Sequence, residues 1–169
     1  MSLSIDSSNV VYLILIGTCV LYILYVMVIN PLFHKIKIKK KLNDLAINNN
    51  KKIIVVNDKS NGSTFKIKVE NKIYTAKLIL TKKNCDLQIN NIDTWVMYIK
   101  SNDTYKCKTI PNMTEFMNYK IDNKIVILAN QAKTIKKVIN ECEMIMVNNE
   151  TNVYGVNIYN LNQLDQLIK

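Results

Sequence analysis

Glycine and histidine are scarce in this chain of 169 residues, which has three glycines and one histidine. The glycines stand apart at Gly17, Gly62 and Gly155, so the chain has no glycine-rich loop to wrap a nucleotide phosphate. The histidine, His34, lies far in sequence from the cysteines and serines that follow the N-terminal region, which removes the usual base of a Ser-His or Cys-His nucleophile. We therefore expect no catalytic residues, no cofactor and no enzymatic activity.

The four cysteines lack the spacing of metal ligands, because no Cys-x-x-Cys pair occurs. A structural zinc site usually needs four locally paired Cys or His ligands, so we predict no metal site. Cys19 lies in the apolar run described below. The other three, Cys85, Cys107 and Cys142, allow one disulfide, with Cys85 and Cys107 as a candidate pair, whereas in a reducing compartment all three are expected to be free. The sequence does not fix the pairing.

Arginine is absent: all 23 basic side chains are lysines, and the formal net charge is +10. Arginine supplies the planar fork that commonly makes bidentate contacts to guanine or phosphate. The abundance of lysine, asparagine and isoleucine is typical of an AT-rich genome. We therefore expect no specific nucleic-acid partner.

Charge is missing from one long stretch, because the twenty residues from Val10 to Ile29 carry no charged side chain. This is about the length that an α-helix needs to cross the hydrocarbon core of a bilayer. A signal peptide has a shorter apolar region of about 7–15 residues with positive charge before it, whereas residues 1–9 contain Asp6 and no lysine. A buried core helix is the other alternative. We interpret residues 10–29 as a transmembrane anchor behind a short polar N-terminus, residues 1–9.

A basic juxtamembrane segment, residues 30–50, follows the anchor. Its lysine collar consists of Lys35, Lys37, Lys39, Lys40 and Lys41. Basic segments are retained on the cytoplasmic side, so we expect a single-pass protein whose C-terminal domain faces the cytoplasm or nucleoplasm. The collar is also expected to attract anionic lipid headgroups, with about 1 kcal/mol from each lysine. Pro31 predicts that the anchor helix ends near Asn30.

The remaining residues, 51–169, suffice for one soluble domain. Short apolar or alternating runs predict strands at Lys52–Val56, Phe65–Val69, Ile73–Leu80, Trp95–Ile99, Ile125–Leu128, Met144–Val147 and Val153–Ile158. The first two are expected to form a hairpin, and the strand that begins at Trp95 is expected to extend the same sheet.

Two helices are predicted in this domain. The first begins at Asn130, and its apolar positions recur at helical spacing: Ala132, Ile135, Val138, Ile139 and Cys142. The second closes the chain from Leu161, with Asn160 as its N-cap. The stretch from Lys100 to Lys124 is expected to be mainly loop. The predicted fold class is α/β or α+β: a single N-terminal transmembrane helix followed by one small mixed-sheet domain with helices near the C-terminus.

An N-terminal span followed by a small α/β domain resembles membrane-tethered proteins with a nuclease-related domain of the restriction-endonuclease type. Such sites hold a divalent metal with an Asp and with a Glu-x-Lys on the next strand. Here Asp86 or Asp93 precedes a strand that ends in Tyr98-Ile99-Lys100, so Tyr98 stands where the metal-binding Glu is expected. The resemblance therefore implies an inactive nuclease-like domain as the alternative function.

An uncharged anchor followed at once by a lysine cluster also resembles the sorting element that places envelope proteins of large insect DNA viruses in the inner nuclear membrane. The span runs into Asn30-Pro31-Leu32, and the chain has a mass of 19.5 kDa. In anchor, collar and length it resembles the family of the fourth per os infectivity factor, an envelope protein of occlusion-derived virions in baculovirus-like and nudivirus-like viruses.

This viral resemblance implies a subunit of a membrane complex needed for oral infection of host cells, in the virion envelope and the host inner nuclear membrane. Its partners would be the bilayer and other envelope subunits of that complex, and it would have no catalytic role. A poxvirus fusion-complex subunit and a cellular membrane protein of an AT-rich microbe are the remaining alternatives.

Replacing Lys100 or Asp93 with alanine separates the nuclease from the assembly subunit. We expect both variants to keep the complexes of the wild type, measured by co-purification of the full-length protein in mild detergent. A nuclease would instead lose magnesium-dependent DNA cleavage, by about a hundredfold or more. Cleavage by the wild type that both substitutions abolish would contradict the viral interpretation.

Overall fold

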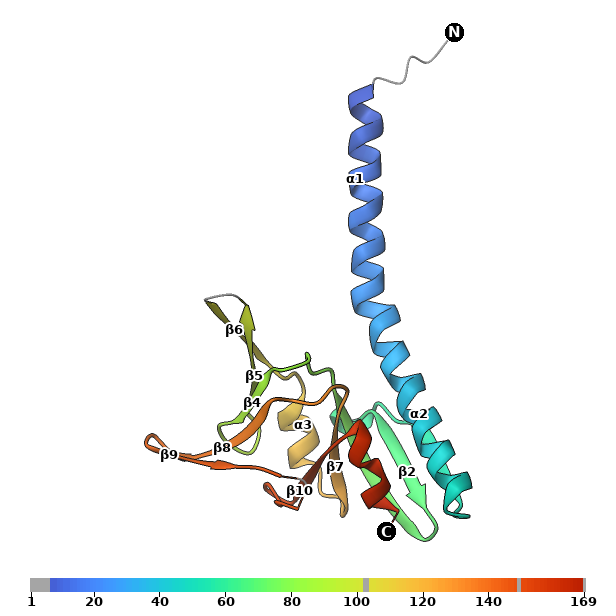
Figure 1. Cartoon of the computed structure of the whole chain (residues 1–169), viewed down its shortest axis with the longest axis vertical. Helices are drawn as coiled ribbons and strands as arrows, with labels where there is room; N and C mark the ends of the chain where they lie inside the picture. The colour runs from blue at the N-terminus through green and yellow to red at the C-terminus, as the bar shows by residue number, and fades with distance from the viewer. Residues whose placement is uncertain (1–6, 102–103, 149, 169) are drawn as a thin grey trace. The chain divides into compact units, whose positions relative to one another are not determined.

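The computed structural model describes residues 7–101, 104–148 and 150–168, and the chain divides into two units between Lys37 and Ile38 (Figure 1). It belongs to the α+β class, with a long N-terminal helix followed by two mixed sheets. The second unit therefore begins inside the segment that the sequence assigns to the basic juxtamembrane region.

The N-terminal unit is helical. Helix α1 (Ser7–Leu24) and the π-helical turn η1 (Tyr25–Ile29) lead without a break into α2 (Asn30–Asn48). Every residue from 10 to 29 is exposed, and of the described residues this is the one helix long and apolar enough to cross a membrane. Pro31 does not end the helix, so that prediction is wrong. Proline cannot donate a backbone hydrogen bond, and the wider turn before it, where Asn30 N–H donates to the carbonyl of Tyr25, lets the helix continue.

The first sheet has the strand order β1-β2-β3-β7-β10. Its strands are β1 (Ile53–Asn57), β2 (Phe65–Val69), β3 (Lys72–Ile79), β7 (Lys124–Leu128) and β10 (Val156–Asn160). The first three pair antiparallel, which confirms the predicted hairpin, and β7 lies parallel between β3 and β10. A one-turn 3-10 helix, η2 (Ser60–Gly62), lies in the β1–β2 connection.

The second sheet has the order β6-β5-β4-β8-β9. Its strands are β4 (Asp86–Ile89), β5 (Trp95–Ser101), β6 (Thr104–Thr109), β8 (Thr134–Asn140) and β9 (Glu143–Met146). Only β4 and β8 pair in parallel. The strand that begins at Trp95 therefore does not extend the first sheet, which corrects that prediction.

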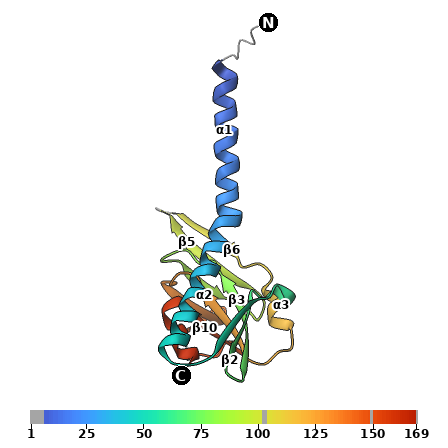
Figure 2. The ribbon, with the colours of Figure 1, turned by 90° about the vertical axis from the view of Figure 1, so that its right-hand side faces the viewer.

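Two hydrophobic clusters cover the two faces of the first sheet. On one face, Ile38, Leu42 and Leu45 of α2 pack with the closing 3-10 helix η3 (Leu161–Leu167). Figure 2 shows the C-terminal part of α2, which belongs to the second unit, in front of these strands. On the other face, the second sheet and the short helix α3 (Met113–Asn118) pack around Trp95 and Phe116. The inner strand β7 is accordingly apolar on both sides.

The predicted amphipathic helix from Asn130 to Cys142 is wrong, because this stretch forms β8 and the turn that leads to β9. Thr134, Ile135, Val138 and Ile139 are β-branched and fit a pleated strand. Parallel pairing with β4 buries part of Ile135 against the core, and a register shift near Val138 disturbs the alternation that would have revealed a strand.

The expected loop from Lys100 to Lys124 contains β6 and α3. Every residue of β6 is exposed, so hydrophobic alternation cannot identify it, and pairing with β5 holds it in place. In α3 the buried Met113, Phe116 and Met117 have the spacing of one helical face. The closing helix is 3-10 rather than α, and Asn160 caps it as predicted.

Two lysines fasten α3 to the first sheet. Lys77 on β3 is 6 % exposed, and its Nζ donates to the carbonyls of Gly62 (2.7 Å) and Asn112 (3.0 Å). At the other end of α3, Lys124 Nζ donates to the carbonyl of Met117 at 2.6 Å. The two ammonium groups lie 5.7 and 5.8 Å from the centroid of the Phe116 ring, within range of cation–π attraction. Burial lowers the pKa of Lys77 to about 8.

Replacing Lys77 with methionine should remove this fastening. We expect a loss of about 1–3 kcal/mol in the free energy of unfolding, measured with urea at neutral pH, because two partly buried hydrogen bonds to carbonyls are lost. Between a pKa of about 8 in the folded chain and the ordinary value of 10.5, the unfolded state binds more protons. The wild type should therefore gain stability relative to the variant as pH rises through this window.

The matched control is Lys106→Met, which removes an exposed lysine of β6. Equal losses and equal pH dependence in the two variants would show that Lys77 contributes only its charge.

Candidate binding surface on the second sheet

One face of the second sheet is not covered by the hydrophobic core. Leu87, Ile89 and Met97 point into the core, so the residues that alternate with them lie on the opposite face, which we call the outer face. Across this face the strand register aligns one row: Cys107 on β6, Tyr98 on β5, Asp86 on β4 and Thr134 on β8. The outer face is therefore a polar surface to which four strands contribute.

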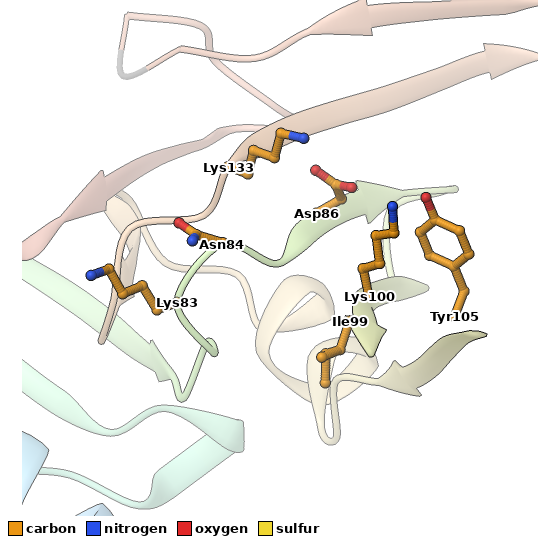
Figure 3. A pocket seen from close by; sticks show the side chains of 7 residues that line it. All are labelled: Lys83, Asn84, Asp86, Ile99, Lys100, Tyr105 and Lys133. Atoms are coloured by element: carbon orange, nitrogen blue, oxygen red, sulfur yellow. The ribbon is translucent and has the colours of Figure 1, made fainter. Parts of the chain in front are cut away.

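A hollow of about 750 Å³ lies where β4 and β8 begin and β5 ends. We call it the lysine hollow; its lining residues are Lys83, Asn84, Asp86, Ile99, Lys100, Tyr105 and Lys133. Figure 3 shows Asp86 between Lys133 and Lys100 in this view, with the Tyr105 hydroxyl beside the Lys100 amine. Residues far apart in the sequence are thus brought to one end of the sheet.

The charges of the lysine hollow are unbalanced. Three lysines and one carboxylate line it, and none of the three ammonium groups forms an ion pair or hydrogen bond with a described residue. Asp86 accepts one hydrogen bond, from Thr134 Oγ1 to Oδ1 at 2.6 Å, which fixes its orientation. Among the described residues the only ion pair lies elsewhere, between Lys66 and Asp58 at 3.1 Å. The hollow therefore carries a net positive potential.

The nuclease-like pattern is only partly assembled. Asp86 faces Tyr98 across the strands and shares the hollow with Lys100, as the resemblance requires for its Asp and Lys. Asp93 lies in the β4–β5 turn at the other end of these strands, where its carboxylate accepts from Thr94. Tyr98 supplies no second carboxylate, and no group of three Asp, Glu, His or Cys side chains suited to a metal occurs in the described parts of the chain.

The second feature of this sheet is the free edge of β9. The β8–β9 hairpin extends away from the body of the domain (Figure 1), and its Met144, Ile145 and Met146 are 50 %, 38 % and 63 % exposed. Val147 N–H donates to the carbonyl of Ile135. Because bonded and non-bonded pairs alternate along antiparallel strands, Ile145 bonds back to β8, whereas the N–H and C=O groups of Met144 and Met146 point away from it.

Lysines flank the β9 edge. Lys136 lies opposite Met146 on the outer face. Lys137 stands on the other face, with its Nζ 4.1 Å from the centroid of the Tyr154 ring. The edge thus combines unpaired backbone groups, apolar side chains and positive charge, and it forms a second candidate surface beside the lysine hollow.

The structure does not bring the candidate disulfide partners together. Cys85 is buried in the core between the sheets, whereas Cys107 is exposed on the outer face, and all four cysteines are free thiols. The collar lysines Lys35 to Lys41 lie along α2, and none has an ion-pair partner among the described residues.

Sequence reasoning did not identify Lys83, Lys133 or the β9 edge. The two lysines belong to connections whose proximity depends on the parallel pairing of β4 with β8. The strand predicted at Met144–Val147 is present, but nothing in its local sequence shows that one side has no neighbouring strand. Its two methionines are the one local feature that is typical of adaptable binding surfaces.

The chain matches no protein-family model, and no curated protein or solved structure is significantly similar to it.

Thiol accessibility should follow the placement of the cysteines. In a Cys19→Ser background, we expect a water-soluble maleimide to label Cys107 and Cys142 at least about tenfold faster than Cys85, because burial both excludes the reagent and raises the pKa of the Cys85 thiol. Mass spectrometry of tryptic peptides measures the rates. Labelling of both Cys85 and Cys107 only after reduction would indicate a disulfide between them.

Proposed function

We propose that this protein is a single-pass, non-catalytic membrane subunit that holds a partner protein by accepting a partner strand at the free edge of β9. The exposed apolar edge of β9, in a domain that continues from a helix long and apolar enough to cross a membrane, is the observation that carries this proposal. Addition of a strand to an open sheet edge is a common mode of peptide recognition, in which backbone hydrogen bonds supply affinity.

The contrast between the two edges of the second sheet supports this choice. The β6 strand at the opposite edge carries Lys106, Lys108 and two threonines, a composition that discourages pairing. The β9 edge has Glu143 at one end and then three exposed apolar side chains. An edge of this kind promotes aggregation unless something covers it, so a partner strand gives it a stable environment.

Charge restricts the chemistry of the partner strand. Lys136 and Lys137 stand on opposite faces beside β9, and the whole chain carries a formal charge of +10. A strand that alternates apolar and acidic residues would place carboxylates near these lysines while its apolar side chains cover Met144 and Met146. The proposed partner is therefore an acidic, extended segment of another protein.

The viral resemblance gives this assembly its proposed setting. The anchor, the lysine collar and the chain length support a subunit of the membrane complex that insect-virus envelopes need for oral infection. In that setting the protein would pass through the host inner nuclear membrane to the virion envelope, and its partners would be other anchored envelope proteins. The collar lysines would also bind anionic lipid headgroups beside the span.

Proline substitutions at the outward positions of β9 test the docking edge. Met144→Pro and Met146→Pro remove N–H groups that point away from β8, so the fold should be kept. We expect recovery of the membrane complex in mild detergent to fall at least about tenfold, since two backbone hydrogen bonds are lost or obstructed. Circular dichroism and thermal unfolding of the same variants check that the domain is intact.

The matched control is Cys107→Pro, which removes an outward N–H from the opposite edge of the same sheet and should leave the complex unchanged. A photo-cross-linking residue at position 146 then identifies the partner segment. Cross-links to an acidic, extended segment of another membrane-anchored protein support the proposal. Folded proline variants that keep the complex, or cross-links to lipid alone, overturn it.

A further inference from the structure

We propose that the lysine hollow binds a phosphorylated polyol of the inositol phosphate class. This site is separate from the β9 edge, and the inference does not depend on the proposed assembly. It rests on the three lysines without partners, on the single fixed carboxylate among them and on the size of the hollow.

The three ammonium groups favour an anionic ligand. Lys83, Lys100 and Lys133 come from three different segments and line one hollow, although none of their ammonium groups has a carboxylate partner among the described residues. Like charges gathered in this way repel one another, and a multivalent anion relieves that repulsion. Ammonium groups bind phosphate oxygens as point charges, without the fork geometry of arginine.

The Asp86 carboxylate favours a ligand that also carries hydroxyl groups. Asp86 only accepts hydrogen bonds when ionised, and Thr134 holds its Oδ1 in place at 2.6 Å. Inorganic phosphate is repelled by this carboxylate, and near neutral pH it offers only its P–OH groups as donors. A polyol phosphate places a free hydroxyl beside the phosphate, so the hydroxyl can donate to Asp86 while the lysines contact the phosphates. The Tyr105 hydroxyl and the Asn84 amide supply further polar contacts at the rim.

The size of the hollow favours a compact ligand over a polymer. Its volume of about 750 Å³ falls within the range of about 300–1,000 Å³ that is usual for small-molecule sites. The lining is polar and positively charged, with Ile99 as its single aliphatic side chain. An extended polynucleotide would instead need a longer basic groove, and the chain has no arginine to read phosphates or bases bidentately.

Two sources can supply this chemistry: the headgroup of a membrane phosphoinositide, or a soluble inositol phosphate. The test uses the full-length protein reconstituted in phosphatidylcholine nanodiscs, titrated with inositol trisphosphate in a calorimeter. We expect saturable binding that weakens steeply with salt. Lys100→Gln and Lys133→Gln should each reduce the affinity about tenfold, because each removes a charge-assisted contact. Lys72→Gln, on the first sheet, is the charge-matched control and should leave the affinity unchanged.

Asp86→Asn provides the sharper test, because it changes the selectivity as well as the affinity. The variant loses a carboxylate that accepts from hydroxyls and repels phosphate, so its preference for inositol trisphosphate over inorganic phosphate should fall about tenfold. A simple patch of positive charge would give the opposite result, with both affinities rising together and the preference unchanged.

Nanodiscs that contain phosphatidylinositol bisphosphate distinguish the two sources. If the lipid headgroup occupies the lysine hollow, the apparent affinity for soluble inositol trisphosphate falls when the lipid is present. In the Lys100→Gln variant the lipid should then no longer change this affinity. If the soluble molecule is the ligand, the lipid has no effect. The proposal is overturned if inositol trisphosphate does not bind, if Lys72→Gln weakens binding as much as Lys100→Gln does, or if single-stranded RNA displaces it at lower concentration.

Discussion

The parallel pairing of β7 between β3 and β10 is the constraint on which the rest of the domain depends. A strand in this position is buried on both faces, so Ile125 and Ile127 face the helical layer while Val126 and Leu128 face the second sheet. Parallel neighbours cannot be joined by a tight hairpin, and each connection must leave the sheet and return. The chain uses both of these excursions to build its second sheet.

The first excursion, between β3 and β7, contributes β4, β5, β6 and α3, and the second, between β7 and β10, contributes β8 and β9. The two meet through the parallel pairing of β4 with β8, which places Asp86 opposite Thr134. This junction creates the lysine hollow, because the connections before β4 and β8 bring Lys83 and Lys133 to the same end of the sheet. The candidate ligand site is therefore a consequence of how the second sheet closes.

Lysine performs three different tasks in this chain without arginine. Lys77 and Lys124 are drawn under α3, where their ammonium groups satisfy backbone carbonyls beside an aromatic ring. The collar lysines lie along α2 and have no ion-pair partner among the described residues. The lysines of the hollow are held near a carboxylate but remain unneutralised. A long flexible stem with a compact charge suits each of these sites, and the surrounding structure decides which task a given lysine has.

The sequence alone determined the long apolar N-terminal helix, most of the strands and the cap at Asn160, because these depend on local properties: an uncharged run of membrane length, short apolar runs, and a side chain that accepts from the helix start. It predicted a helix at residues 130–142, where β8 forms, and a loop at residues 100–124, where β6 and α3 form. The two strands were missed because their stability comes from pairing with other strands rather than from their own periodicity. Only the tertiary structure decided that there are two sheets rather than one, that Cys85 and Cys107 lie on opposite sides of the second, and that β9 is left at an edge. The lysine hollow also depends on the tertiary structure, because its lining residues are distant in the sequence and come together only through the three-dimensional path of the chain.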